Sequence, residues 1–149
     1  MSTSFQLQNK SINSKELPHN IEAEQGIIGA ILLNNEIYYD ISEKINADHF
    51  YEPIHKLIFN VLGKKIAKGQ IATPITLKSF FEVEKNLEEI GGSNYLVRLA
   101  NSAVSLDYAR NYAEIIYNLA VRRGLFELGG KVQHDAIESD IETKPEDLI

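Results

Sequence analysis

The sequence predicts an all-α protein, with a compact multi-helix head followed by one long projecting helix. Apolar residues recur at spacings of three and four along most of the 149-residue chain, as on the buried face of a helix. Proline, glycine and asparagine clusters separate these segments. The last such segment, residues 106–138, would form a helix about 50 Å long, which exceeds the width of a domain of this size.

The stretch 21–34 is predicted to be the central helix of the head. Asn20 is a suitable N-cap, and Glu22 and Glu24 place negative charge where the helix dipole favours it. The following residues, 26–33, carry no polar side chain, so the helix should be buried on most sides. A buried strand also suits so short an apolar run, but the helix formers before it favour a helix. Small side chains that admit a second helix lie on one face: Ala23, Gly26 and Ala30.

Two further helices are expected before residue 70. Residues 36–45 carry isoleucines at helical spacing and form a short amphipathic helix. Pro53 opens the next helix, because proline is tolerated at the first helical position, and Gly69 ends it. Its apolar residues form one wide face, and its lysines lie mostly off that face.

The remainder of the head is predicted to contain shorter helices. Thr76 is expected to cap a helix in which Leu77, Phe80, Phe81 and Val83 are the candidates to point inward. Leu87 and Ile90 indicate a further helical turn before the strong stop at Gly91-Gly92, and Ser93 is expected to cap a helix that buries Tyr95, Leu96 and Leu99.

The long helix, residues 106–138, is capped by Ser105 and carries two apolar stripes. The first comprises Ala109, Tyr112 or Ala113, Ile116 and Ala120. The second is displaced by about 100° around the axis and comprises Val121, Leu125, Leu128 and Val132. The displacement predicts two packing partners, so the second stripe is the candidate oligomer interface. Alternatively, the helix wraps a single core or ends early at Gly129-Gly130.

The predicted core and chain organisation follow from these assignments. Residues 1–16 are expected to be a disordered lead-in, 17–104 the helical head, and 105–149 the long helix with the start of a truncated hairpin, so that the chain is a fragment. The candidate core residues are Ile27, Ile28, Ile31, Leu32, Leu57, Ile58, Val61, Phe80, Leu96, Leu99 and Ile116.

Composition excludes several functions. The formal charge of −6 argues against an autonomous nucleic-acid-binding module, since phosphate contacts need a basic face. Residues 131–149 contribute six acids and two lysines, as a solvated helix end or linker would. The chain has no cysteine, no secretion signal and no apolar run long enough to cross a membrane, which favours the cytoplasm.

No catalytic or cofactor site is predicted. His49, Glu52 and His55 recur every three residues, but Pro53 interrupts them and this spacing drifts around a helix axis, so they are interpreted as surface or interface residues rather than metal ligands. The glycine-lysine pairs, Gly63-Lys64 and Gly130-Lys131, lack the rest of a phosphate-binding loop.

The sequence resembles the N-terminal domain of bacterial replicative DNA helicases of the DnaB type. The resemblance covers residues 17–138, and its opening block is specific. The matching residues are Pro18-His19-Asn20-Ile21-Glu22-Ala23-Glu24-Gln25, Gly29, Leu32, Asp48, Phe50-Tyr51, His55, Ile58-Phe59, Ile75-Thr76-Leu77, Gly91-Gly92, Tyr95-Leu96, Leu99, Tyr112-Ala113, Ile115 and Arg123.

The resemblance implies a head and a helical hairpin whose second helix would pack on Val121, Leu125, Leu128 and Val132; that helix has barely begun at Ile149, which would leave the stripe to pair between chains. It also implies that heads and hairpins pair with other copies, form a collar of three dimers on a hexamer, and help to recruit primase. ATP and magnesium would be bound by a RecA-like motor domain absent from this chain. The chain would then be inactive by itself, and would contact DNA only through the full-length hexamer of an ATP-driven 5′-to-3′ helicase. Two alternatives are a helical DNA-binding domain, which the charge disfavours, and a self-contained helical adaptor or oligomerisation module unrelated to replication.

Overall fold

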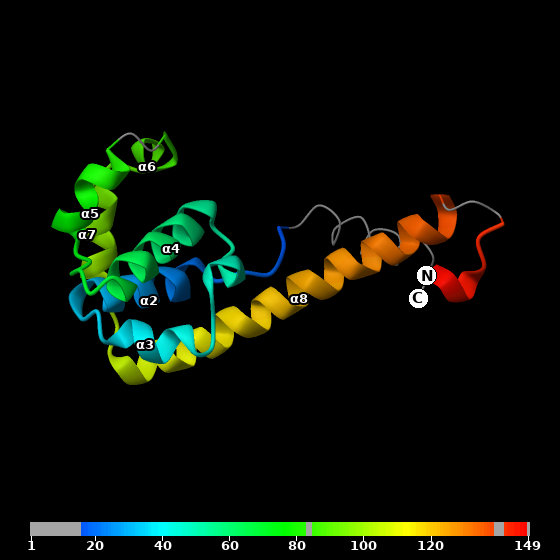
Figure 1. Cartoon of the computed structure of the whole chain (residues 1–149), viewed down its shortest axis with the longest axis horizontal. Coiled ribbons are helices and arrows are strands. Elements are labelled where there is room, and N and C mark those ends of the chain that lie inside the picture. Colours follow the sequence, from blue (N-terminus) through cyan, green and yellow to red (C-terminus); the bar gives the residue numbers. More distant parts are fainter. Residues whose placement is uncertain (1–15, 83–84, 139–141, 149) are drawn as a thin grey trace, which may run out of the picture.

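The computed structural model describes residues 16–82, 85–138 and 142–148, and all regular structure among them is helical. Figure 1 shows a head from which the long helix α8 projects far beyond the other helices of the head, with η2 beside its distal end. The predicted fold class is therefore confirmed. The expected disorder of residues 1–16 and the inward orientation of Val83 fall almost entirely outside the described residues. The elements are α2 (Ile21–Leu33), α3 (Ile37–Ser42), η1 (Ala47–His49), α4 (Pro53–Ala67), α5 (Pro74–Phe81), α6 (Lys85–Glu89), α7 (Asn94–Asn101), α8 (Leu106–Glu138) and η2 (Pro145–Leu148).

Helix α2 is the centre of the head, as predicted. The Asn20 side chain accepts a hydrogen bond from the backbone N–H of Ala23 (3.0 Å), and the apolar run behind it is buried. Helices α7 and α8 both pack on α2. The closest approach is at Gly29, where an added Cβ would overlap the carbonyl oxygen of Leu99 in α7. Gly26, in the predicted strip of small residues, faces Tyr112 of α8.

The predicted core residues are buried with two exceptions. Buried residues from the predicted set are Ile27, Ile28, Ile31, Leu32, Ile58, Val61, Leu96, Leu99 and Ile116. Leu57 is half-buried at the margin of the core. Phe80 was wrongly assigned, because it is 54% exposed and lies edge-on against the ring of Phe81. Helix α5 is short and packs mainly on α7, so Leu77 and Phe81 fill its narrow buried face.

Two predicted caps are also corrected. Helix α5 begins after Thr73, whose hydroxyl accepts from the N–H of Thr76, while the Thr76 hydroxyl accepts from the N–H of Thr73. Thr76 is thus the third residue of the helix rather than its cap. Ser93 precedes α7 but has helical backbone angles and makes no capping hydrogen bond. The preceding turn depends on Gly91 and Gly92, which have positive φ angles of 110° and 65°.

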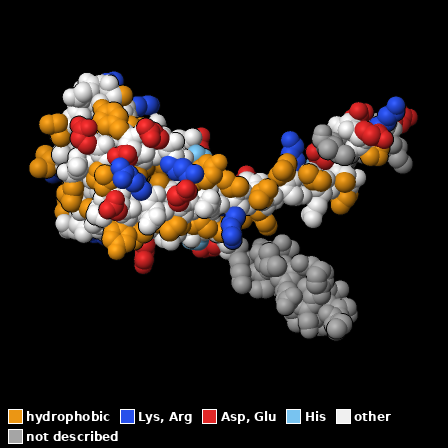
Figure 2. Space-filling view, turned by 90° about the horizontal axis from the view of Figure 1, so that it is seen from below, with side chains coloured by type: hydrophobic (Ala, Val, Ile, Leu, Met, Phe, Trp, Pro, Cys, Tyr) orange, Lys and Arg blue, Asp and Glu red, His pale blue; other side chains and the backbone are white. Residues whose placement is uncertain are grey.

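Helix α8 is continuous from Leu106 to Glu138 and has two distinct halves. The first half packs on α2 and α3 and buries Ala109, Ala113 and Ile116. The second half leaves the head, and its side chains are mostly exposed (Figure 2). Gly129 and Gly130 lie within the helix, so the alternative of an early end is wrong.

Candidate functional site

The projecting half of α8 exposes an apolar stripe, which we call the distal stripe: Val121, Leu125, Leu128 and Val132. These side chains are 43%, 62%, 56% and 55% exposed. The repeat of four, three and four residues keeps them on one side of the helix, since successive residues are about 100° apart. Four large aliphatic side chains in a row on a projecting helix form a surface that favours burial against another apolar face. Phe126 and Ile137 are also exposed on this arm, but off the stripe.

The distal stripe lies on the same side of α8 as two ion pairs that join α8 to residues of α3 and just after it. Arg110 contacts Asp40 of α3 through its Nη2 atom (3.2 Å), and Glu114 contacts Lys44 just after α3 (3.2 Å). Counted at 100° per residue, Arg110, Glu114 and the stripe fall within an arc of about 60°. The stripe therefore continues the side of α8 that forms these exposed ion pairs, and it is displaced from the buried face of Ala109, Ala113 and Ile116.

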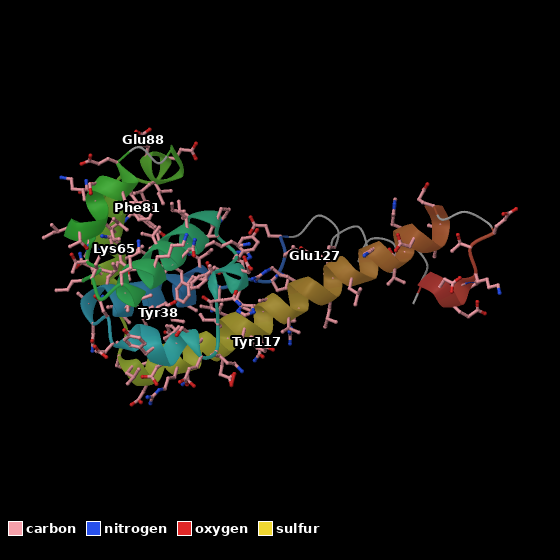
Figure 3. All side chains as sticks on the ribbon, in the orientation of Figure 1. Tyr38, Lys65, Phe81, Glu88, Tyr117 and Glu127 are labelled. Carbon is pink, nitrogen blue, oxygen red and sulfur yellow. The ribbon has the colours of Figure 1, made fainter. Side chains whose placement is uncertain are left out.

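Arg123 holds α8 against the head where the arm departs. Its Nη1 donates to the carbonyl oxygen of Pro18 (2.9 Å) and its Nη2 to that of His49 (2.7 Å). The guanidinium lies over the ring of Tyr51, against which the imidazole of His19 is stacked at 4.1 Å. These contacts fix the direction in which α8 leaves the head, in the stretch between Tyr117 and Glu127, which are labelled in Figure 3.

His49 is a structural residue of η1. Its Nδ1 accepts a hydrogen bond from the backbone N–H of Asn46 (3.0 Å), and its ring meets that of Tyr117 of α8 edge-on. Burial lowers the pKa of His49, nearby Asp48 raises it, and Arg123 lowers it. The lowered pKa favours the neutral ring that can accept this hydrogen bond.

A buried polar cluster behind the start of α4 was missed by the sequence analysis. Glu24 and His55 are 1% and 0% exposed, so interpreting His55 as a surface or interface residue was wrong. The His55 Nδ1 atom lies 2.8 Å from Glu24 Oε1, and the Nε2 atom lies 2.6 Å from the Tyr95 hydroxyl. Glu24 also accepts from the N–H groups of Tyr51 (2.8 Å) and Glu52 (3.3 Å). One carboxylate thereby accepts from the backbone N–H groups of the two residues that precede α4.

The cluster has one arrangement of protons that satisfies every group. The Gln25 amide donates to the Tyr95 oxygen, so the Tyr95 hydroxyl donates onward to Nε2 of His55, and the Nδ1–H group of His55 donates to Glu24. Burial raises the pKa of the Tyr95 phenol, which keeps this donor protonated. No buried side-chain polar atom among the described residues lacks a partner, so the cluster is a complete structural network.

The described part of the chain contains neither a metal site nor a membrane span. No three histidine or acidic side chains converge on one point within it, and His55 is committed to Glu24 and Tyr95 rather than to His49 and Glu52. No helix in that part is both long enough and apolar enough to cross a bilayer.

Comparison with known proteins points to one family. Residues 16–118 match the model of the DnaB-like helicase N-terminal domain. The chain is 41% identical over 133 residues to the replicative DNA helicase DnaB of Rickettsia felis and 35% identical over 117 residues to that of Buchnera aphidicola. These matches cover 89% and 78% of this chain, but only 27% and 25% of the relatives. The chain thus spans about a quarter of the length of the curated relatives it matches.

Solved structures agree with this assignment. The N-terminal domain of DnaB helicase from Mycobacterium tuberculosis is 25% identical and superposes with a TM-score of 0.79, covering 89% of this chain and 92% of that one. A structure described as a DnaB-like replicative helicase and its interactions with primase is 22% identical with a TM-score of 0.61. It covers 87% of this chain and 34% of the helicase, and supports the fold.

Proposed function

The chain belongs to the family of DnaB-like helicase N-terminal domains, and we propose that it is an assembly module that pairs through the distal stripe. In this proposal the head (residues 17–104) and the arm (residues 105–149) of several copies form the collar of a hexameric replicative helicase. The collar also recruits primase, a partner named in the description of the structural neighbour. The exposed apolar stripe is the observation that carries the proposal.

The activity of the longer relatives would reside outside the matched region. ATP-driven 5′-to-3′ strand separation, with its ATP and magnesium, would belong to a motor domain of the full-length protein. The acidic charge of the chain supports a role in which DNA is contacted only through the assembled hexamer. The working location would be the replication fork in the bacterial cytoplasm.

Burial favours pairing of the stripe with a second copy. The four side chains occupy three turns of a straight helix and leave apolar surface in water, at a cost of roughly 25 cal/mol per Å². A self-complementary surface of this kind suits a twofold dimer, because each stripe meets an identical one.

The position of α3 favours an antiparallel pair. Packed helices lie about 8–10 Å apart, and α3 stands on the stripe side of α8. A parallel partner would bring its own α3 into the same space, whereas an antiparallel partner puts the two heads at opposite ends. The twofold axis then passes between residues 126 and 127, so that Val121 faces the partner's Val132 and Leu125 faces the partner's Leu128.

Disruption of the stripe tests the pairing. We expect the Leu125→Asp, Leu128→Asp double variant to sediment as a folded monomer where the unmodified chain sediments as a dimer, because four carboxylates would be buried in the interface. The measurement is sedimentation equilibrium, with circular dichroism as the check on folding. A matched control is Phe126→Asp, which changes an exposed apolar residue of the same arm off the stripe and should leave the dimer intact. A chain that is monomeric before substitution would contradict the proposal, and a double variant that unfolds would assign the stripe to the core.

Single cysteines test the polarity, because the natural chain has none. Chains carrying Val121→Cys are expected to crosslink to chains carrying Val132→Cys when the two are mixed and oxidised. Either variant alone should give little crosslinked dimer, since an antiparallel pair separates identical residues by many ångströms. Crosslinking of each variant to itself would instead indicate a parallel pair.

A self-contained helical adaptor remains the second candidate function. The all-helical head is its only support. The two candidate functions differ in the partner that the chain binds. Binding of primase from the same organism to the dimer, measured by calorimetry, would support the replicative function, and the absence of binding would favour the adaptor.

A further inference from the structure

Arg123 is the outermost residue of α8 that hydrogen-bonds to the head in the described part of the chain. Its guanidinium joins two separate segments, since it donates to the carbonyl oxygen of Pro18, before α2, and to that of His49 in η1. It also lies over the ring of Tyr51. We call this set of contacts the Arg123 clasp. Among the described residues of α8, none beyond Ile116 is buried, so the clasp ties the start of the projecting half to the head.

An arginine side chain suits this contact. Its planar guanidinium carries five N–H donors in a fixed fork, so it can donate to two carbonyl groups while it lies over an aromatic ring. A lysine has one charged nitrogen at the end of a flexible stem and cannot meet all three groups in the same geometry. Hydrogen bonds from a charged donor are also stronger than those from a neutral one. The clasp therefore holds three segments of the chain in one arrangement.

The helix is weak immediately after the clasp. Gly124 follows Arg123, and an added Cβ there would contact nothing within 4 Å, so no close packing requires this glycine. Gly26 and Gly29 of α2, by contrast, each face atoms of a neighbouring element at short distance. Glycine has more backbone freedom than other residues and is a poor helix former. Helix α8 can therefore bend at Gly124 more readily than in the half that packs on α2, which contains no glycine.

Open space lies beside Gly124. A cavity of about 340 Å³ lies between the head and α8, and Leu17, Gly124 and Glu127 are among the residues that line it. Because side chains do not fill this space, the projecting half of α8 can change its angle here without the loss of a packed contact.

A bend at Gly124 would break the line of the distal stripe. Val121 lies on the head side of Gly124, whereas Leu125, Leu128 and Val132 lie beyond it. In the antiparallel pair, Val121 of each copy faces the partner's Val132. Contacts at both ends of the pair thus require a helix that is straight through Gly124.

We propose that the Arg123 clasp is a latch, which keeps α8 straight through Gly124 and so allows the distal stripe to pair. With the latch open, the projecting half changes its angle about Gly124 while the first half stays packed on α2 and α3. The effect on pairing rests on the proposed function, whereas the bend itself is a property of a single chain.

Distances between spin labels test the latch within one chain. The natural chain has no cysteine, so labels can be attached at Glu43→Cys, just after α3, and at Gln133→Cys, on the projecting half. Both positions are exposed. The labels are placed in the Leu125→Asp, Leu128→Asp background, in which the chain is expected to be monomeric, so that each distance lies within one molecule.

Removal of the clasp should broaden the distance between the labels. We expect one narrow distribution with Arg123 present and a broad one after Arg123→Ala, because α8 is then free to bend at Gly124. The matched control is Arg122→Ala, which removes the same charge from the adjacent exposed residue and should leave the distribution narrow.

Sedimentation equilibrium of the chain with its natural stripe tests the effect on pairing. Arg123→Ala should raise the dissociation constant of the dimer about tenfold, because pairing must then straighten a helix that the clasp no longer holds. Arg123→Lys, which keeps the charge but not the fork of donors, should raise it less. Circular dichroism and thermal unfolding check that the head is folded. If Arg123→Ala does not fold, Arg123→Lys replaces it in both measurements.

Gly124→Ala provides a rescue that distinguishes a hinge from general loosening of the head. Combined with Arg123→Ala, it should narrow the distance distribution and restore most of the lost affinity. Alanine resists bending of the helix, and its Cβ has room at this position.

The outcomes separate the latch from the pairing itself. A narrow distribution in Arg123→Ala would overturn the latch, because continuity of the helix would then be enough to hold the projecting half. A broad distribution with an unchanged dissociation constant would overturn its role in pairing, and failure of the Gly124→Ala rescue would overturn the hinge. A chain that does not self-associate would overturn the proposed pairing, whereas the distance measurement would still decide whether the latch exists.

Discussion

Replacement of Glu24 by alanine is expected to destabilise the head by about 3–5 kcal/mol, because it leaves three hydrogen-bond donors without their acceptor, at a cost of about 1–3 kcal/mol for each donor that stays buried. The His55 Nδ1–H group and the backbone N–H groups of Tyr51 and Glu52 would each lose their acceptor in a site closed to water. The segment just before α4 would lose the acceptor that holds it against α2. The measurement is urea unfolding at neutral pH, followed by circular dichroism.

Glu22 provides the matched control for this experiment. It lies two residues away in the same first turn of α2 but is exposed, so Glu22→Ala should change the free energy of unfolding by no more than about 0.5 kcal/mol. Equal effects of the two substitutions would mean that only the helix dipole is involved. The Glu24→Gln variant should lie between them, since its amide oxygen can still accept one of the three hydrogen bonds.

The sequence could not reveal this cluster because burial of Glu24 is a tertiary effect. From the sequence, Glu24 and Glu22 are equivalent acids at the start of a helix, and both suit its dipole. Glu24 is buried because the chain before α4 returns across the start of α2, bringing His55 and the N–H groups of two residues to it. Two features of the sequence could have indicated the cluster. They are a histidine, His55, among the apolar residues of one predicted helix, and an acid, Glu24, in the first turns of another.

The distal stripe was predictable because it follows from periodicity along a single helix. The apolar residues between 121 and 132 follow the helical repeat. Their angular displacement from the stripe of Ala109, Ala113 and Ile116 can be counted along this one helix, without knowing where the other elements lie. Helix ends set by several residues together were harder to predict. Thr73 and Thr76 form reciprocal hydrogen bonds, and from the sequence either threonine could be the N-cap. Proline is favoured at the first helical position, so Pro74 indicates that Thr73 is the N-cap.

The groove between α3, η1 and α4, which is lined by Tyr38 and Gly63 among others, was not predictable in the same way. The lysines of α4 were expected only to lie mostly off its apolar face, and nothing in the sequence indicates that Tyr38 crosses to Gly63 and makes one wall of this groove. Contacts between residues 25 apart depend on how α3 and α4 dock. Glycine at such a position is weakly informative alone, because the same residue type also occurs at helix positions that contact nothing.

The chain contains glycines at close helix contacts and glycines that contact nothing. Substitution by alanine is expected to have opposite effects on stability at these two kinds of position. Gly29→Ala is expected to destabilise the head by about 3 kcal/mol, near the upper end for an overpacked core, because the obstacle to the new methyl group is the backbone of α7. Helices α2 and α7 would have to separate along a fully buried contact that includes Leu96 and Leu99. Intrinsic helix propensity acts in the other direction, since alanine is favoured over glycine by about 1 kcal/mol within a helix.

Gly129→Ala measures the effect of helix propensity on stability without an effect of packing. An added Cβ at Gly129 contacts nothing within 4 Å, so the substitution should stabilise α8 by about 0.5–1 kcal/mol and raise its helix content without altering the head. The pair is measured by thermal unfolding and hydrogen exchange, with the arm and head amides followed separately. If Gly29→Ala also proves stabilising, propensity outweighs packing at that position and the close approach of α2 to α7 is not a fixed feature of the fold. If it destabilises while Gly129→Ala stabilises, the close approach of α7 requires glycine in α2, whereas the glycines of the arm only weaken the helix that carries the distal stripe.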